Sequence, residues 1–89
     1  MEFTWSETKR VSNLKLHGLD LIDTILVFER LTFTFEDDRF SYNEQRFVTL
    51  GLLTGIPVSI IHTETAHEIR IISFRKATKR EITIYHNHI

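Results

Sequence analysis

The spacing of apolar residues changes near residue 30 of this chain of 89 residues, and that change limits the folds open to it. Up to Glu29 the apolar residues recur at helical intervals. From Leu31 onward they alternate with polar residues, as in LTFTF at residues 31–35, which is typical of a half-buried strand. Helices followed by a series of strands predict the α+β class rather than repeated β-α-β units.

Two helices are expected before the strands. The first begins after Ser6, a residue type favoured at N-caps, and ends at Gly18, which tolerates the left-handed conformation of a C-terminal cap. Val11 and Leu14 share one face of this helix. The second helix begins after Asp20, another favoured N-cap. Its predicted core-facing residues are Leu21, Ile22, Ile25, Leu26 and either Phe28 or Glu29.

The rest of the chain predicts an antiparallel sheet of three or four strands, followed by a C-terminal helix. Strand signals cover residues 31–35, 46–53, 58–63 and 68–75, and residues 2–5 form a short edge strand. Thr54-Gly55 predicts a two-residue hairpin, and residues 36–39 predict an exposed turn. The last helix begins near Thr78, with Ile82 and Tyr85 on one face. Residues 1–89 are expected to form a single domain.

The composition narrows the classes of function. Hydrophobic residues make up 42% of the chain, which is enough for a packed core, and the absence of Cys excludes disulfides and thiolate zinc sites. No apolar run approaches the roughly 18 residues of a membrane span, and no signal peptide opens the chain. We therefore expect a cytoplasmic protein with no membrane attachment. The formal net charge of −1 argues against a general nucleic-acid coat, which is usually basic throughout.

Positive charge is nevertheless concentrated near the C-terminus. Residues 62–89 hold five Lys or Arg residues and three acids. All five lie in the segment RIISFRKATKRE at residues 70–81; they are Arg70, Arg75, Lys76, Lys79 and Arg80. Strict alternation along the last strand places Arg70, Ile72 and Phe74 on one face and Ile71, Ser73 and Arg75 on the other. The segment predicts one local basic site rather than a basic surface.

The predicted hairpins bring a set of catalytic candidates to neighbouring positions of one sheet. These candidates are Glu44, Arg46, His62, Arg70 and Arg75. A carboxylate, an imidazole and several guanidinium groups suit the cleavage of RNA by its own 2′-OH. That reaction needs a base, an acid for the leaving 5′-oxygen and cations for the phosphorane, and it needs neither a metal nor a cofactor. Arg suits the phosphorane because its planar fork binds two phosphate oxygens. The sequence leaves open which of His62 and Glu44 is the base and which is the acid.

Each candidate also has a purely structural interpretation. Arg70 on an alternating strand could be a solvated or ion-paired side chain, and Glu44 could simply pair with Arg46. A histidine in a strand interior, such as His62, is often half-buried and hydrogen-bonded. Solvation or core packing likewise accounts for Lys76, Lys79, Arg80 and Tyr85.

The order of particular residues along the chain says more than its composition. The pieces that matter are Phe3-x-Trp5-x-x-x-Lys9-x-x-x-Asn13, His17-Gly18, Glu44-x-Arg46-Phe47, His62, Arg70-Ile71-Ile72-Ser73-x-Arg75-x-Ala77 and Glu81-x-x-x-Tyr85. Together they resemble the BrnT family of toxins over nearly the whole chain, and residues 70–85 are the most specific part. BrnT toxins belong to type II toxin–antitoxin systems and are similar to the RelE class of small ribonucleases, in which helices pack on an antiparallel sheet.

The resemblance implies a metal-independent endoribonuclease toxin that cuts RNA, above all mRNA, and thereby inhibits translation and growth. It implies that Arg70 and Arg75 handle the phosphate. The residues implied to hold the flanking RNA are Lys76, Lys79, Arg80 and Tyr85. The implied partner is a cognate BrnA-like antitoxin, a ribbon-helix-helix DNA-binding protein, so the toxin would reach DNA only through its antitoxin.

Phe74 departs from the family pattern, in which a small Ala is usual at this position. It leaves open a second function from a different class: an antitoxin-binding module with weakened catalysis that acts in the repression of its own operon. A plain nucleic-acid-binding domain is a third interpretation, which the net charge of −1 disfavours.

Overall fold

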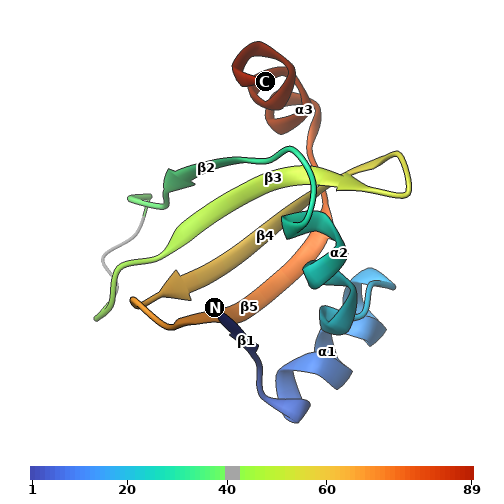
Figure 1. Cartoon of the computed structure of the whole chain (residues 1–89). Coiled ribbons are helices and arrows are strands. Elements are labelled where there is room, and N and C mark those ends of the chain that lie inside the picture. Colours follow the sequence, from blue (N-terminus) through green and yellow to red (C-terminus); the bar gives the residue numbers. More distant parts are fainter. Residues whose placement is uncertain (40–42) are drawn as a thin grey trace.

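Helices and a single sheet succeed one another in the order that the sequence predicts (Figure 1). The computed structural model describes residues 1–39 and 43–89. Its elements are β1 (Glu2–Thr4), α1 (Glu7–His17), the 3-10 helix η1 (Leu21–Asp23), α2 (Thr24–Phe28), β2 (Phe33–Glu36), β3 (Phe47–Leu53), β4 (Ile56–Glu64), β5 (Glu68–Lys76) and α3 (Lys79–His88). The predicted α+β class is confirmed. In the described ranges no helix combines the length and the hydropathy needed to cross a bilayer.

The sheet has the strand order β1-β5-β4-β3-β2. Strands β2 to β5 form the predicted antiparallel meander of four strands. β1 adds a fifth strand that runs parallel to β5, with Phe3 opposite Ile69. The sequence predicts this edge strand but not its partner, because β1 and β5 lie more than 60 residues apart in the chain.

Local capping signals place the ends of the helices as predicted. The Ser6 side chain accepts a hydrogen bond from the Lys9 amide, and Gly18 has φ 70° at the end of α1. Asp20 caps η1 through the amide of Ile22. Thr78 opens α3 with a reciprocal capping box to Glu81, so each residue satisfies a backbone amide of the other.

Each face of the sheet carries its own apolar cluster. Helices α1 and α2 lie on one side of the sheet, and α3 lies at the other end of the molecule (Figure 1). The first cluster, called the helical-face core, consists of Leu21, Val27, Val58, Ile60, Ile69, Ile71 and Phe74. The second, on the opposite face beneath α3, consists of Val48, Leu50 and Tyr85. We call this second side of the sheet the α3 face.

The predicted buried face of the second helix is wrong in part. Ile22 and Leu26 are 43% and 50% exposed, whereas Thr24 and Val27 are completely buried. The helix starts as the 3-10 segment η1, which has three residues per turn. Burial therefore falls on Leu21 and then at intervals of three, rather than on the positions that an ideal α-helix would bury.

A bulge in β5 changes the faces that its side chains occupy. His62 of β4 pairs with Ile71, but the preceding Ile61 pairs with Ser73, so Ile72 has no partner across the strand pair. The expected alternation is therefore wrong beyond Ile72. Arg70 lies opposite Thr63 and Arg75 lies opposite Ser59, and these β4 residues are four positions apart on an unbroken strand. Arg70 and Arg75 consequently share the α3 face, not opposite faces.

Candidate functional site

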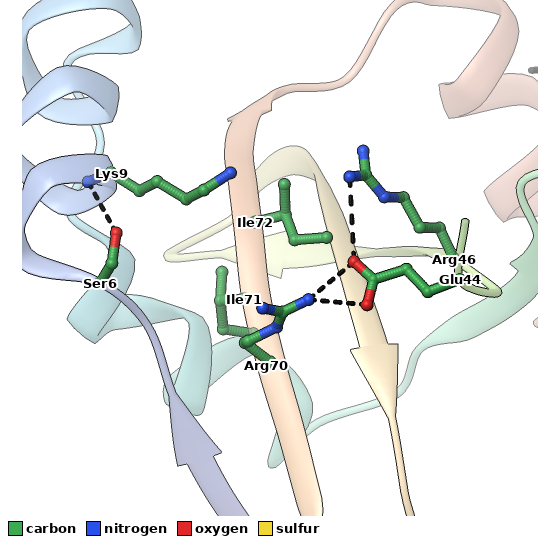
Figure 2. Close-up of a pocket in the computed structure, with 7 residues that line it drawn as sticks. All are labelled: Ser6, Lys9, Glu44, Arg46, Arg70, Ile71 and Ile72. Carbon is green, nitrogen blue, oxygen red and sulfur yellow. Dashed lines mark hydrogen bonds and ion pairs between the residues drawn. The ribbon is translucent and has the colours of Figure 1, made fainter. Parts of the chain in front are cut away.

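A pocket of about 230 Å³ lies where the first turn of α1 approaches β5 and the residues that precede β3 (Figure 2). It is lined by Ser6, Lys9, Glu44, Arg46, Arg70, Ile71 and Ile72. Three of these side chains are cations and one is an anion. The predicted group of Glu44, Arg46 and Arg70 is thus brought together, and we call this hollow the cationic pocket.

A contact between Nη2 of Arg70 and the carboxylate of Glu44 forms the centre of the cationic pocket (Figure 2). Nη2 of Arg70 donates to Oε1 and Oε2 of Glu44 at 2.7 and 2.9 Å. Nη2 of Arg46 lies 3.9 Å from Oε1 of the same carboxylate. Arg70 and Glu44 are each nearly half exposed, so water screens the pair and the carboxylate can leave without a large cost in stability. An anion of similar size, such as a phosphate, could take its place.

Lys9 supplies a third cation that sequence reasoning did not assign to the site. It lies in α1, one turn after Trp5, and its side chain extends toward β5 and the other pocket residues (Figure 2). Within residues 1–39 and 43–89 its ammonium has no ion-pair partner and no hydrogen bond. The available signal was the spacing Trp5-x-x-x-Lys9-x-x-x-Asn13, which identifies Lys9 as part of a pattern but not as a neighbour of Arg70.

Arg75 shares the face of Arg70 but lines a different cavity. Its Nη1 and Nη2 donate to the two carboxylate oxygens of Glu81 at 2.8 and 3.1 Å. Glu81 also accepts from the hydroxyl of Ser59 and the amide of Thr78. Burial opposes ionisation of Glu81, but the hydrogen bonds from Arg75 and Thr78 outweigh it and lower the pKa of the carboxyl group. Arg75 therefore attaches α3 to the sheet through a fully bonded carboxylate.

His62 does not join the predicted group. It is completely buried on the helical face, because it pairs with Ile71, whose side chain belongs to the helical-face core. Its Nε2 lies 2.7 Å from the hydroxyl of Thr49. Burial lowers the pKa of His62 to about 4, so the ring is neutral near pH 7. The expectation that His62 lies beside Glu44 is wrong, since the strand itself separates the two side chains.

The residues predicted to hold flanking RNA divide into two groups. The exposed group consists of Lys76, Lys79 and Arg80, at the end of β5 and the start of α3. Arg80 also lines the cavity of about 370 Å³ that contains Arg75 and Glu81. Tyr85 is different: it is 3% exposed, and its hydroxyl donates to the carbonyl of Leu31. The expected contact of Tyr85 with RNA is not supported, because its ring is part of the core beneath α3.

One further expectation concerns the acidic turn at residues 36–39. Asp37, placed by sequence in an exposed turn, is 5% exposed, and its amide extends the pairing of β2 with β3 by bonding to the carbonyl of Arg46. No described group of three or more His, Cys, Asp or Glu residues is placed to hold a metal ion.

The fold and the cationic pocket together define a class of protein: a small α+β domain that presents a carboxylate among several cations on an open sheet face. Such a site suits an anionic substrate, and a phosphodiester in particular. Residues 5–81 match the family described as "Ribonuclease toxin, BrnT, of type II toxin-antitoxin system". The chain therefore belongs to the BrnT family of ribonuclease toxins, and a type II system implies an antitoxin partner. A search of curated proteins gives no match.

Proposed function

We propose that this toxin is a metal-independent endoribonuclease that cleaves RNA, with mRNA as the main substrate, in the cationic pocket. The observation that carries the proposal is the pairing of the Glu44 carboxylate with Nη2 of Arg70, with Arg46 and Lys9 lining the same pocket. The carboxylate occupies the place where a phosphate would meet Arg70 and Arg46, and Lys9 lines the same pocket. In this proposal, a bound phosphate displaces the carboxylate from Arg70, and the displaced carboxylate acts on the adjacent 2′-OH.

Each of these side chains has a role in the proposed reaction. Glu44 takes the proton of the 2′-OH, whose oxygen attacks the adjacent phosphorus and displaces the 5′-oxygen. Arg70 stabilises the phosphorane through its fork, and Arg46 and Lys9 add positive charge around it. The ammonium of Lys9 is the proposed proton donor to the leaving 5′-oxygen, because the other two cations hold their protons at any working pH. Three fixed cations supply the charge that a metal ion would otherwise provide.

The residues outside the cationic pocket have lesser roles in this proposal. Arg75 is held by Glu81 and serves to attach α3, so we do not place it at the scissile phosphate. Lys76, Lys79 and Arg80 hold the flanking RNA through long-range, salt-sensitive attraction. His62 and Tyr85 take no part in the chemistry, since both are buried in the core.

The proposed partner is a BrnA-like antitoxin that carries a ribbon-helix-helix DNA-binding part. The toxin acts in the cytoplasm, where cleavage of mRNA stops translation and growth. The antitoxin neutralises it and brings the complex to operator DNA. The half-exposed cations of the cationic pocket favour an acidic segment of the antitoxin at this surface.

The alternative of a catalytically weakened module depends on whether the side chain at position 74 obstructs the cationic pocket. Phe74, the residue that raised it, is completely buried in the helical-face core. Its side chain therefore points away from the cationic pocket and does not fill it. The family's small residue at this position would change core packing rather than the space available to RNA.

Cleavage of RNA by the purified protein in the presence of EDTA tests the proposal directly. We expect cleavage products that end in a 2′,3′-cyclic phosphate, since the attacking oxygen belongs to the substrate. The Arg70→Ala variant serves as the control against contaminating ribonucleases. Complete loss of cleavage on chelation, restored by a divalent metal, would contradict the metal-independent mechanism.

A further inference from the structure

Asn13 is the one buried residue of α1, and its side chain bonds to a strand instead of to its own helix. Its Nδ2 donates to the carbonyls of Leu19 and Phe74, both at 2.8 Å. Its Oδ1 accepts from the amide of Phe74 at 2.9 Å. The side-chain amide thus makes with Phe74 the pair of hydrogen bonds that a residue of a neighbouring strand would make.

These bonds lie at a critical position along β5. β1 pairs with β5 only as far as Thr4, opposite Arg70, so the edge beyond it has no strand neighbour. Asn13 takes the place of that neighbour at Phe74. The unpaired Ile72 of the bulge lies between the end of β1 and this contact. Asn13 therefore fixes the backbone directly after the bulge that sets the face of each β5 side chain.

The same contact sets the position of Lys9. Lys9 precedes Asn13 by four residues, so both side chains lie on one side of α1. Both line a cavity of about 180 Å³ together with Ile72 and Ser73 of the bulge. Lys9 also lines the cationic pocket, where its side chain reaches toward β5 (Figure 2). The place that its ammonium can reach depends on where α1 is held against β5.

We propose that Asn13 is a positioning residue of the ribonuclease site: by bonding to the backbone of Phe74 it holds Lys9 over the cationic pocket and maintains the bulge next to Arg70. This inference rests on the proposed function of that pocket. Asn13 does not touch the substrate, because it is 6% exposed and all its donors and its acceptor are used within the protein. A displacement of about 1 Å at a catalytic group can lower a rate about 10²-fold.

Four variants separate positioning from stability: Asn13→Ala, Lys9→Ala, the double variant and Thr24→Ala. Thr24 is the matched control, since it is completely buried, donates to the carbonyl of Leu21 at 2.7 Å and does not line the cationic pocket. Each variant is assayed at a temperature at which circular dichroism shows it to be folded. We expect Asn13→Ala and Lys9→Ala each to lower kcat about 10²-fold with little change in KM. The double variant should be no worse than Lys9→Ala, and Thr24→Ala should stay within about twofold of the wild type.

Two results would overturn the inference. One is an Asn13→Ala variant as active as Thr24→Ala, and the other is a double variant whose losses multiply. If Asn13→Ala does not fold, the inference is tested by NMR on the wild-type protein instead. Titration with a non-cleavable 2′-deoxy dinucleotide should then shift the side-chain amide signals of Asn13 by NMR, while those of the exposed Asn87 stay in place. Unshifted Asn13 signals in the titrated protein would refute the inference.

A separate readout distinguishes failure of this inference from failure of the proposed function. If the wild type does not cleave RNA at all, the proposed function fails, and binding of inorganic phosphate to the cationic pocket becomes the test. Equal and non-additive weakening of phosphate binding in Asn13→Ala and Lys9→Ala would support the positioning role. Phosphate binding by Asn13→Ala that equals the wild type would overturn it.

Discussion

At the scale of single residues, the contact of Arg70 with Glu44 is better suited to binding than to stability. Exposed ion pairs contribute about 0–1 kcal/mol to folding. Both side chains are nearly half exposed, yet one guanidinium nitrogen, Nη2 of Arg70, bonds to both oxygens of the carboxylate. A guanidinium that is oriented but not buried is what a phosphate-binding site requires.

Replacement of Arg70 is the first prediction at this scale. Arg70→Ala should lower RNA cleavage about 10² to 10³-fold, as does the loss of other groups that stabilise a developing oxyanion. Arg70→Lys should retain most of the defect, because it keeps the charge and loses the fork. Lys79→Ala is the matched control, since an exposed rim charge affects mainly salt dependence. If a folded Arg70→Ala variant cleaves RNA normally while the Lys79→Ala variant is inactive, the active site lies elsewhere.

Glu44→Gln gives the second prediction, and its two effects have opposite signs. Cleavage should fall strongly because the base is lost. Binding of a non-cleavable 2′-deoxy analogue should become tighter, because the carboxylate no longer competes with phosphate for Arg70. Fluorescence anisotropy measures the Kd, with Glu29→Gln as an exposed control outside the pocket. Weaker binding by Glu44→Gln would show that the carboxylate contributes to RNA recognition instead of opposing it.

At the scale of secondary-structure elements, Glu81 is expected to hold α3 on the sheet. Glu81→Ala removes bonds to Arg75, Ser59 and the Thr78 amide, and should lower the free energy of unfolding by about 2 kcal/mol. Urea titration measures this loss, with the exposed Glu29→Ala as a control expected to change stability by less than about 0.5 kcal/mol.

Arg75→Ala should resemble Glu81→Ala rather than Arg70→Ala. We expect a loss of stability and a change in cleavage per folded molecule of less than about tenfold. A loss of cleavage as large as that of Arg70→Ala, without a loss of stability, would return Arg75 to the catalytic group.

Elements whose signals are local could be predicted from the sequence, and those that depend on distant contacts could not. The caps at Ser6 and Asp20 and the Thr54-Gly55 hairpin are short-range signals, and the structure confirms all three. The bulge at Ile72 has no local signal, and the side chain that bonds to the strand beside it, Asn13, lies 61 residues from Phe74 in the chain.

The candidate site follows the same rule. The prediction that Glu44, Arg46 and Arg70 lie together agrees with the structure, although Glu44 and Arg46 precede β3 instead of belonging to a strand. Alternation failed for Arg75 because one unpaired residue reverses the faces beyond it. It failed for His62 because the register of β4 against β5 decides which face the ring occupies, and the sequence does not fix that register.

At the scale of the whole molecule, the distribution of charge predicts how the protein meets its partners. The net charge is −1, and the cations are concentrated around the cationic pocket and the start of α3. We expect induction of this chain alone to stop bacterial growth, and co-expression with the product of the adjacent gene to restore growth and yield a stable complex. Electrophoretic mobility shifts should show specific operator binding only for the complex. Specific binding of operator DNA by the isolated chain would contradict this division of roles.

The buried His62 makes the stability of the whole domain sensitive to mild acid. In the unfolded chain a histidine binds a proton below about pH 6.5, but burial holds protonation of His62 in the folded protein back to about pH 4. Between these values the unfolded state binds more protons, so stability falls as the pH falls. A hydrogen bond with the backbone of Thr63 favours the protonated ring but offsets only part of the effect of burial on the pKa of His62.

We expect the free energy of unfolding, measured in urea, to fall by about 2–3 kcal/mol between pH 7 and pH 4.5. His62→Gln should remove most of this dependence, because glutamine can still bond to the hydroxyl of Thr49 but does not titrate. The exposed His67→Gln is the matched control and should keep the slope of the wild type. The carboxyl groups of Asp20 and Glu81 have pKa values below the usual range. They lose their stabilising charge only at lower pH and therefore do not obscure the change between pH 7 and pH 4.5. A wild-type profile that is flat above pH 4.5 would show that the imidazole is protonated without unfolding the core around it. An unchanged slope in His62→Gln would show that another group causes the pH dependence.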